Sequence, residues 1–197
     1  MSVRADHTAI ASRVAKGARV LDVGCGDGQL LALLRDVRSV DARGLELDSA
    51  DAGRAVARGL SVVQGDADAD LEIFPDNSFD VAILSKAIQH MRRPDHVMAE
   101  LTRLAPRVIV SFRNYGHWPR RLFLLANGRM PSKQSWYSES VLHPCTVSDM
   151  LDLAAHTGLV PVAAASVSGE RISSFRQGGF GRLNWAADDV IAEFARS

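Results

Sequence analysis

The chain has little that would hold a nucleic acid, a membrane or a metal ion. Its 23 Lys and Arg residues are matched by 23 Asp and Glu residues, so no net basic charge attracts a polyanion. No uninterrupted apolar stretch reaches membrane length, and the two cysteines, Cys25 and Cys145, have no metal-ligand residues spaced around them. We therefore expect a soluble, cytoplasmic protein with no metal, nucleic-acid or membrane partner, which acts on small molecules or proteins.

The length of the chain favours one domain. Its 197 residues are enough for one well-buried core and too few for two domains of ordinary size. Segments typical of strands alternate with segments that favour helices, which predicts an α/β fold. We expect a single domain over residues 1–197, with a doubly wound, mostly parallel sheet of about seven strands and helices on both faces.

The expected elements can be given as residue ranges. Strands are predicted at 20–23, 42–48, 60–64, 79–85, 107–112 and 159–167. Helices are predicted at 29–35, 95–105, 119–127 and 147–156, the last with a capping box formed by Thr146 and Asp149. The segment 190–196 stays open, because its alanines favour a helix whereas the fold calls for an edge strand.

Three glycines at alternate positions follow the first strand. Gly24, Gly26 and Gly28 come directly after the apolar run that begins at Val20, and the helix-forming segment 29–35 comes next. Glycine has no Cβ and tolerates positive φ, so such a turn lets the backbone lie against a nucleotide-like ligand. The order of strand, glycine turn and helix predicts a cofactor-binding turn.

The residues around this turn argue against a phosphate ligand. A dinucleotide fingerprint needs Gly or Ala where Gln29 stands, and a phosphate loop needs a lysine, yet no Lys or Arg lies between Arg19 and Arg35. At about 4 Å, Asp22 and Asp27 would each oppose a pyrophosphate by several kcal/mol. Both carboxylates would attract a cation. S-adenosylmethionine has a cationic sulfur, an α-amino group and no phosphate, so it suits this turn.

Acidic residues end the next two strands. Glu46 lies about twenty residues after the turn, where a carboxylate can accept both ribose hydroxyls. Asp66 follows the third strand and can accept from an adenine amino group. The alternative is that both residues only cap the helices after their strands. The predicted cofactor site comprises Asp22, Gly24, Cys25, Gly26, Gly28, Glu46, Leu47, Asp66, Ala67 and Ser85.

No catalytic residue is predicted. Methyl transfer to an O–H or C–H acceptor needs a base near Ser85, and the candidates are His90, His117 and His143. None of them sits in a motif that fixes such a role, and a hydrogen-bonded structural histidine is the simpler alternative. The Asn/Asp-Pro-Pro-aromatic turn used for amino methylation is absent after the fourth strand, where the sequence reads Ser-Lys-Ala-Ile.

Aromatic residues and arginines gather after the fifth strand. Six of the twelve aromatics fall in this region, namely Phe112, Tyr115, Trp118, Phe123, Trp136 and Tyr137, with Arg113, Arg120, Arg121 and Arg129 among them. These residue types dominate interface energetics, so we predict a lid or a partner-binding insertion at about 113–143. We assign Trp118, Trp136 and Tyr137 to the lid or interface. We expect Leu122 and Leu125 of the helix at 119–127 to pack into the core.

The first two-thirds of the chain resemble a class I S-adenosylmethionine-dependent methyltransferase, and later motifs narrow the resemblance. From about Asp6 to about Thr146 the chain resembles the methionine biosynthesis family MetW, on the motifs Leu84-Ser85, Gln89, Met91-Arg92-Arg93-Pro94-Asp95, Ser111-Phe112, Asn114, Gly116-His117-Trp118, Gly128-Arg129-Met130-Pro131, Trp136-Tyr137, His143 and Cys145-Thr146. This resemblance implies binding of S-adenosylmethionine or S-adenosylhomocysteine, and association with a MetX-type homoserine O-acyltransferase whose activity the protein supports.

The chain departs from the family pattern at three positions. Lys86, Arg113 and Pro144 stand where Gln, Pro and Leu are expected. Lys86 puts a cation at the mouth of the methyl-donor site, which is unfavourable unless its ammonium points away or meets a carboxylate. Two functional hypotheses therefore stay open: an accessory subunit of the acyltransferase, and a working methyltransferase for an unidentified small molecule.

Overall fold

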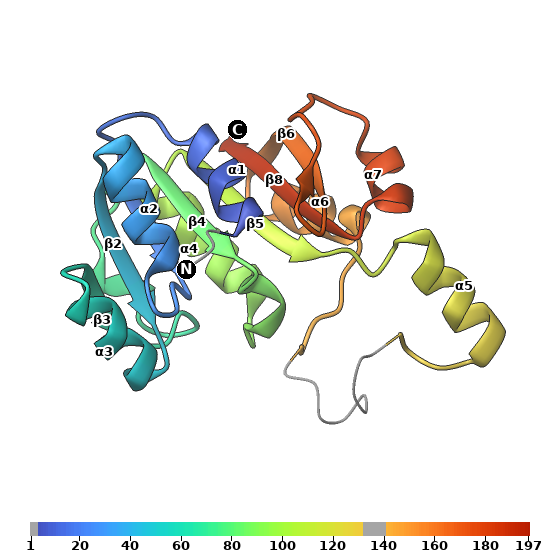
Figure 1. Cartoon of the computed structure of the whole chain (residues 1–197), viewed down its shortest axis with the longest axis horizontal. Coiled ribbons are helices and arrows are strands. Elements are labelled where there is room, and N and C mark those ends of the chain that lie inside the picture. Colours follow the sequence, from blue (N-terminus) through green and yellow to red (C-terminus); the bar gives the residue numbers. More distant parts are fainter. Residues whose placement is uncertain (1–3, 132–140) are drawn as a thin grey trace.

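A computed structural model describes residues 4–131 and 141–197. In these residues an eight-stranded sheet has the order β3-β2-β1-β4-β5-β8-β6-β7 (Figure 1). The strands are β1 (Arg19–Val23), β2 (Asp41–Glu46), β3 (Ser61–Gln64), β4 (Val81–Ser85), β5 (Arg107–Arg113), β6 (Leu159–Ser168), β7 (Arg171–Ile172) and β8 (Asp189–Arg196). The predicted α/β fold with a mostly parallel sheet is confirmed. The segment left open at 190–196 is strand β8, which lies antiparallel between β5 and β6.

Helices cover the sheet on both faces. They are α1 (Ala5–Arg13), α2 (Gln29–Arg38), α3 (Ser49–Ala57), α4 (Pro94–Leu104), α5 (Trp118–Asn127), α6 (Val147–His156) and α7 (Phe180–Ala186), with short 3₁₀ helices η1 (Leu71–Ile73) and η2 (Ile88–His90). The predicted capping box of α6 is confirmed, since Thr146 and Asp149 exchange side-chain and backbone hydrogen bonds. Pro94 starts α4 at a position where its missing N–H costs nothing.

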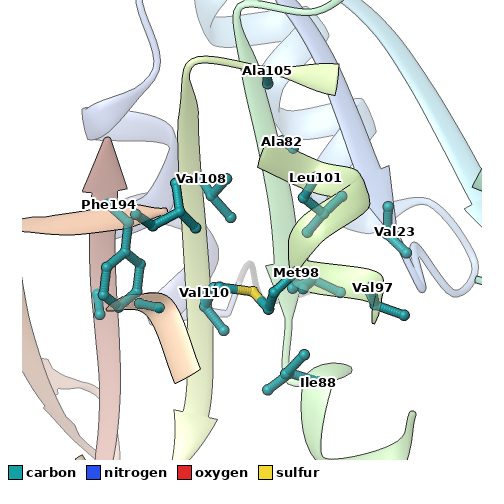
Figure 2. Close-up of a cluster of buried hydrophobic side chains, with 14 of the residues drawn as sticks. Val23, Ala82, Ile88, Val97, Met98, Leu101, Ala105, Val108, Val110 and Phe194 are labelled. Carbon is teal, nitrogen blue, oxygen red and sulfur yellow. The ribbon is translucent and has the colours of Figure 1, made fainter. Parts of the chain in front are cut away.

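Alternating side chains of the central strands build the two halves of the core. In β4, Ala82 and Leu84 pack against α4 and α6, whereas Val81 and Ile83 pack against α1 and α2. Figure 2 shows the first half of the core around Met98 of α4. A strand buried on both faces reads as a continuous apolar run, which is why its position could be predicted from the sequence.

Parallel pairing brings the carboxyl ends of β1, β2, β3 and β4 to one edge of the sheet. The glycine turn, the segment after Glu46, the segment after Gln64 and the segment after Ser85 therefore lie together at this edge. Ligands of open α/β sheets bind outside the carboxyl ends of the strands. The candidate site is at this edge.

Helix α5 projects away from the sheet (Figure 1), and it has no buried residue. Leu122 is 53% exposed and Leu125 is 83% exposed, so the expectation that they pack into the core is wrong. The apolar periodicity of a helix identifies an apolar face, but it does not say what covers that face. Of the aromatics predicted here, Phe112 is buried in the core, Trp118 is exposed, and Trp136 and Tyr137 lie outside the described residues.

None of the helices within residues 4–131 and 141–197 has the length and apolar character needed to span a bilayer.

Candidate functional site

The glycine turn is held against strand β2 by its backbone. The N–H groups of Gly24 and Cys25 both donate to the carbonyl of Leu45, at 2.8 and 3.3 Å. All three glycines have positive φ, and a Cβ on Gly24 would come within 2.8 Å of the Cβ of Ala87. At Gly26 a Cβ would meet nothing within 4 Å, so this residue faces open space. The turn therefore presents bare backbone to a ligand.

Gly28 has a different role. It begins α2 in a left-handed conformation, and a Cβ there would lie 2.4 Å from Leu60 and 3.0 Å from the Cβ of Ala55. Gly28 contributes to neither of the cavities described next. Its lack of a side chain is explained by close packing of α2 against α3 and β3.

Glu46 connects the glycine turn to the start of α3. One carboxylate oxygen accepts from the N–H of Gly26 at 2.7 Å, and the other accepts from the N–H of Asp48 at 2.9 Å. The cap of α3 is Asp48, whose side chain accepts from the N–H of Asp51. The alternative that Glu46 serves only as a helix cap therefore does not hold, and its carboxylate is fixed at the edge of the site.

A polar cavity of about 120 Å³ lies on one side of Gly24. It is lined by Asp22, Ser85 and two residues of the N-terminal segment, Arg4 and His7, together with Cys25, Gly26, Asp27, Gln29 and Leu30. Asp22 is 1% exposed, and within the described residues its Oδ1 and the Oγ of Ser85 have no hydrogen-bond partner. Buried polar atoms are nearly always paired in proteins, so the chemistry of these two atoms fits a polar ligand.

Burial affects the protonation of the Asp22 carboxyl group and the Cys25 thiol in this cavity. Desolvation, together with the nearby Glu46 carboxylate, raises the pKa of Asp22 to about 8. Burial also raises the pKa of the Cys25 thiol, with further contributions from Asp22 and Glu46, which keeps the thiol un-ionised. A cationic group placed beside Asp22 would favour the charged form of its carboxylate. This agrees with the prediction from the sequence that Asp22 attracts an ammonium or a sulfonium.

A second cavity of about 300 Å³ lies on the other side of Gly24 and shares Gly24 and Ser85 with the first. Its lining includes the predicted residues Glu46, Leu47, Asp66 and Ala67, and also Leu45, Gly65, Asp68, Lys86, Ala87, His90 and Met91. Both apolar and carboxylate groups face this space. Nine of the ten predicted site residues thus line one cavity or the other, with Gly28 as the exception.

Asp66 is engaged by its own loop and by Arg92. Its carboxylate accepts from the N–H of Asp68 at 2.9 Å and from the Arg92 guanidinium at 2.5 Å. Asp68 accepts from the N–H groups of Arg92 and Arg93; burial opposes its ionisation, but these bonds and the Arg92 charge outweigh that effect and lower its pKa. Asp66 therefore caps no helix, because the N-cap of the next helix, η1, is Asp70; its carboxylate bonds instead within its own loop and to Arg92.

Lys86 meets carboxylates away from the glycine turn. Its Nζ lies 2.9 Å from Asp189 of β8 and 3.9 Å from Asp6 of α1. The residue has a φ of 58°, and its N–H donates to the carbonyl of Ser111 at 2.9 Å. The cation that departs from the family pattern is therefore neutralised by partners that are distant in sequence.

The histidine candidates are scattered. His90 lines the second cavity near Ser85, His117 lies 3.8 Å from Asp188, and the Nε2 of His143 lies 3.4 Å from the carbonyl of Arg92. His7, which the sequence did not single out, lines the first cavity. Only tertiary packing of α1 brings Arg4 and His7 to the glycine turn, so no local motif could have identified them.

The fold and the site define the class of protein to which the chain is similar. A S-adenosylmethionine-dependent methyltransferase from Thermotoga maritima matches 99% of this chain and 90% of its own, with a TM-score of 0.72 at 18% identity. A second such enzyme from Mesorhizobium loti matches 98% of both chains, with a TM-score of 0.72 at 19% identity. At this identity the likeness shows the fold alone, which is that of the S-adenosylmethionine-dependent methyltransferases.

Residues 4–186 match the family described as methionine biosynthesis protein MetW, and the chain belongs to this family. The bifunctional methionine biosynthesis protein MetXA/MetW of Rhodopirellula baltica is 27% identical over 81% of this chain and 28% of its own length. A fatty-acid O-methyltransferase of Mycolicibacterium smegmatis is 38% identical over 52% of this chain and 39% of its own. The chain spans less than two fifths of the length of these two relatives.

Proposed function

We propose that this MetW protein binds S-adenosylmethionine or S-adenosylhomocysteine across the two cavities and supports a MetX-type homoserine O-acyltransferase. The observation that carries the first part is the pair of buried oxygens on Asp22 and Ser85, which have no hydrogen-bond partner in the described part of the chain. The observation that carries the second is the exposed apolar face of α5, in a family with a relative named MetXA/MetW.

The donor set fits each part of the cofactor. Asp22 would bind the α-amino group, because an ammonium would donate a hydrogen bond to its buried Oδ1 and would provide a positive charge opposite the carboxylate. Glu46 would accept the ribose hydroxyls, and the second cavity, bordered by Leu47, Ala67 and Met91, would hold the adenine. When bound, S-adenosylmethionine would supply an electrophilic methyl group.

Calorimetric titration with S-adenosylhomocysteine tests the binding site. Glu46→Ala should weaken binding by about 1.5–3 kcal/mol, because the ribose hydroxyls lose a charged acceptor. Glu46→Gln, which keeps one acceptor oxygen, should lie between Glu46→Ala and the wild type. Lack of binding at millimolar concentration, or equal affinities for all three proteins, would overturn the site assignment.

The acyltransferase partnership is supported by the shape of the insertion. The start of α5 is anchored by Arg120, which pairs with Asp188, and by Arg121, which donates to the carbonyl of Gly116. The helix exposes Trp118 before this anchor, and Leu122, Phe123, Leu124 and Leu125 after it. A rigidly held helix with exposed aromatic and aliphatic groups flanked by arginines is typical of a protein interface.

Co-expression with the matching homoserine O-acyltransferase tests this partnership. The two proteins should co-purify, and Trp118→Ala should weaken the complex by about 2 kcal/mol, as expected of an interface hot spot. Binding of S-adenosylhomocysteine should survive this change. If no complex forms and the acyltransferase activity is the same with and without the chain, the accessory function is excluded.

A methyltransferase acting on a small molecule is the second candidate function. A cavity of about 750 Å³ lies beside the cofactor cavities, because it shares Arg4 with one and Lys86 with the other. Asp6, Glu170, Asp188 and Asp189 also line it. This space could admit a polar acceptor, and methyl transfer with no acyltransferase complex would favour this function over the first.

A further inference from the structure

A third region of the molecule has the features of a ligand site. A cavity of about 320 Å³ lies between β6, the segment after β7, and α7. Among the described residues it shares no lining residue with the two cavities at the glycine turn. It contains two arginines, Arg176 and Arg182, and the three serines Ser166, Ser173 and Ser174.

One wall of this cavity is fixed to the sheet by hydrogen bonds. Ala164 and Arg176 exchange two backbone hydrogen bonds of 3.0 Å each. Ser173 donates its N–H to the carbonyl of Ser166, and its Oγ accepts from the N–H of Ser166, both at 3.0 Å. The segment that carries Arg176 is therefore held against β6. This limits the conformational entropy that the segment would lose when a ligand binds.

The opposite wall is fixed by a buried asparagine. The Nδ2 of Asn114 donates to the carbonyls of Leu183, Asn184 and Ala187, at 3.3, 2.9 and 2.9 Å. Asn114 is completely buried, so these bonds tie α7 to the end of β5. Arg182 projects from this anchored helix, and Leu183 on the same helix lines the cavity.

The charge of the cavity is uncompensated. No carboxylate lines it, and within residues 4–131 and 141–197 neither Arg176 nor Arg182 has an ion-pair partner. Arg103, by contrast, pairs with both Asp76 and Glu100. Both arginines are exposed, and two such residues lining one cavity with no carboxylate among its lining residues attract an anion.

We propose that this cavity binds a small molecule that carries a phosphate group beside an apolar portion. A phosphate dianion balances two arginines, each of which can donate two parallel hydrogen bonds to it. The hydroxyl of Ser173 already donates to the carbonyl of Ser174, so Ser166 and Ser174 would supply the further donors, and Ala164, Leu183 and Ala186 supply apolar contact. A phospholipid headgroup shares this chemistry, but the cavity is sized for a free phosphate monoester.

Titration calorimetry of the full chain with phenyl phosphate and with inorganic phosphate tests the proposal. Phenyl phosphate should bind about tenfold more tightly, because only its ring can contact the apolar residues. Arg176→Gln and Arg182→Gln should each weaken its binding about tenfold, through loss of a charged bidentate donor. Arg171→Gln is the matched control, since Arg171 is exposed on β7 outside the cavity and its loss should change nothing.

Three results would overturn the proposal. The first is the absence of saturable binding of either probe up to about 10 mM, because a preformed site should bind more tightly than that. The second is an equal effect of Arg171→Gln. The third is binding only to phosphatidylcholine vesicles that contain phosphatidic acid, with none to phenyl phosphate, which would assign the arginines to a membrane surface. Thermal unfolding of each variant verifies that the fold is kept.

Discussion

The glycine turn makes most of its contacts within the chain, whereas helix α5 leaves most of its apolar side chains exposed. The turn is held by its own chain: its N–H groups bond to Leu45 and Glu46, and Gly24 and Gly28 pack against neighbouring elements. Helix α5 is anchored at one end and otherwise exposes its apolar side chains. A region whose partners lie within the chain can be understood from that chain alone. The apolar groups that α5 exposes are the observation on which the proposed partner rests.

Two glycines of the turn, Gly28 and Gly26, are expected to differ most in their effect on stability. Gly28→Ala should lower the free energy of unfolding by about 3 kcal/mol, from a left-handed conformation and a clash with Leu60 and Ala55. Gly26→Ala meets no atom within 4 Å and should cost only about 1 kcal/mol, but its methyl group enters the cofactor cavity. Urea unfolding with S-adenosylhomocysteine titration separates the two: equal losses of stability would show that Gly28 is not a packing residue.

How far the sequence predicts this molecule depends on where the relevant contacts lie. Strand β4 and the turn after β1 were predictable, because continuous apolar runs and glycine spacing are local signals. The contributions of Arg4 and His7 were not, because α1 reaches the turn only through tertiary packing. Leu122 and Leu125, expected in the core, are exposed, because an apolar helix face in the sequence does not say whether this chain covers it.

Asp22 should make stability depend on pH in a specific direction. Its pKa is about 8 in the folded protein and about 4 when unfolded, so between these values the unfolded chain releases a proton that the folded chain keeps. The free energy of unfolding should therefore fall by about 1.4 kcal/mol per pH unit across this window. Below it, Asp22 is protonated in both states and the stability it confers is fully present.

Asp22→Asn removes this titration while keeping the shape of the side chain. The difference in unfolding free energy between variant and wild type should shift in favour of the variant as the pH rises from about 5 to about 8. Urea unfolding at several pH values measures it. Parallel pH profiles for the two proteins would show that Asp22 ionises normally and that the cavity does not exclude water.

Lys86→Gln should have the smallest effect. The ammonium is partly exposed and bonds to Asp189, so its loss should cost at most about 1 kcal/mol of stability. Because it points to β8 and α1, affinity for S-adenosylhomocysteine should be unchanged or slightly higher. A clear loss of affinity in the calorimeter would mean instead that Lys86 contacts the cofactor. The cofactor site would then extend to the residues of β8 that surround Lys86.

We propose that the chain carries a cofactor site and a separate partner surface on α5. The most direct test is the affinity for the homoserine O-acyltransferase, measured by titration calorimetry for the wild type, Leu125→Asp, Val56→Asp and Glu46→Ala. Val56 is an exposed apolar residue of α3 and serves as the matched control. Leu125→Asp should weaken the complex at least about 30-fold, the equivalent of a hot-spot residue, whereas Val56→Asp and Glu46→Ala should leave it unchanged. Equal affinities for all four proteins, or a loss as large for Val56→Asp as for Leu125→Asp, would contradict the claim.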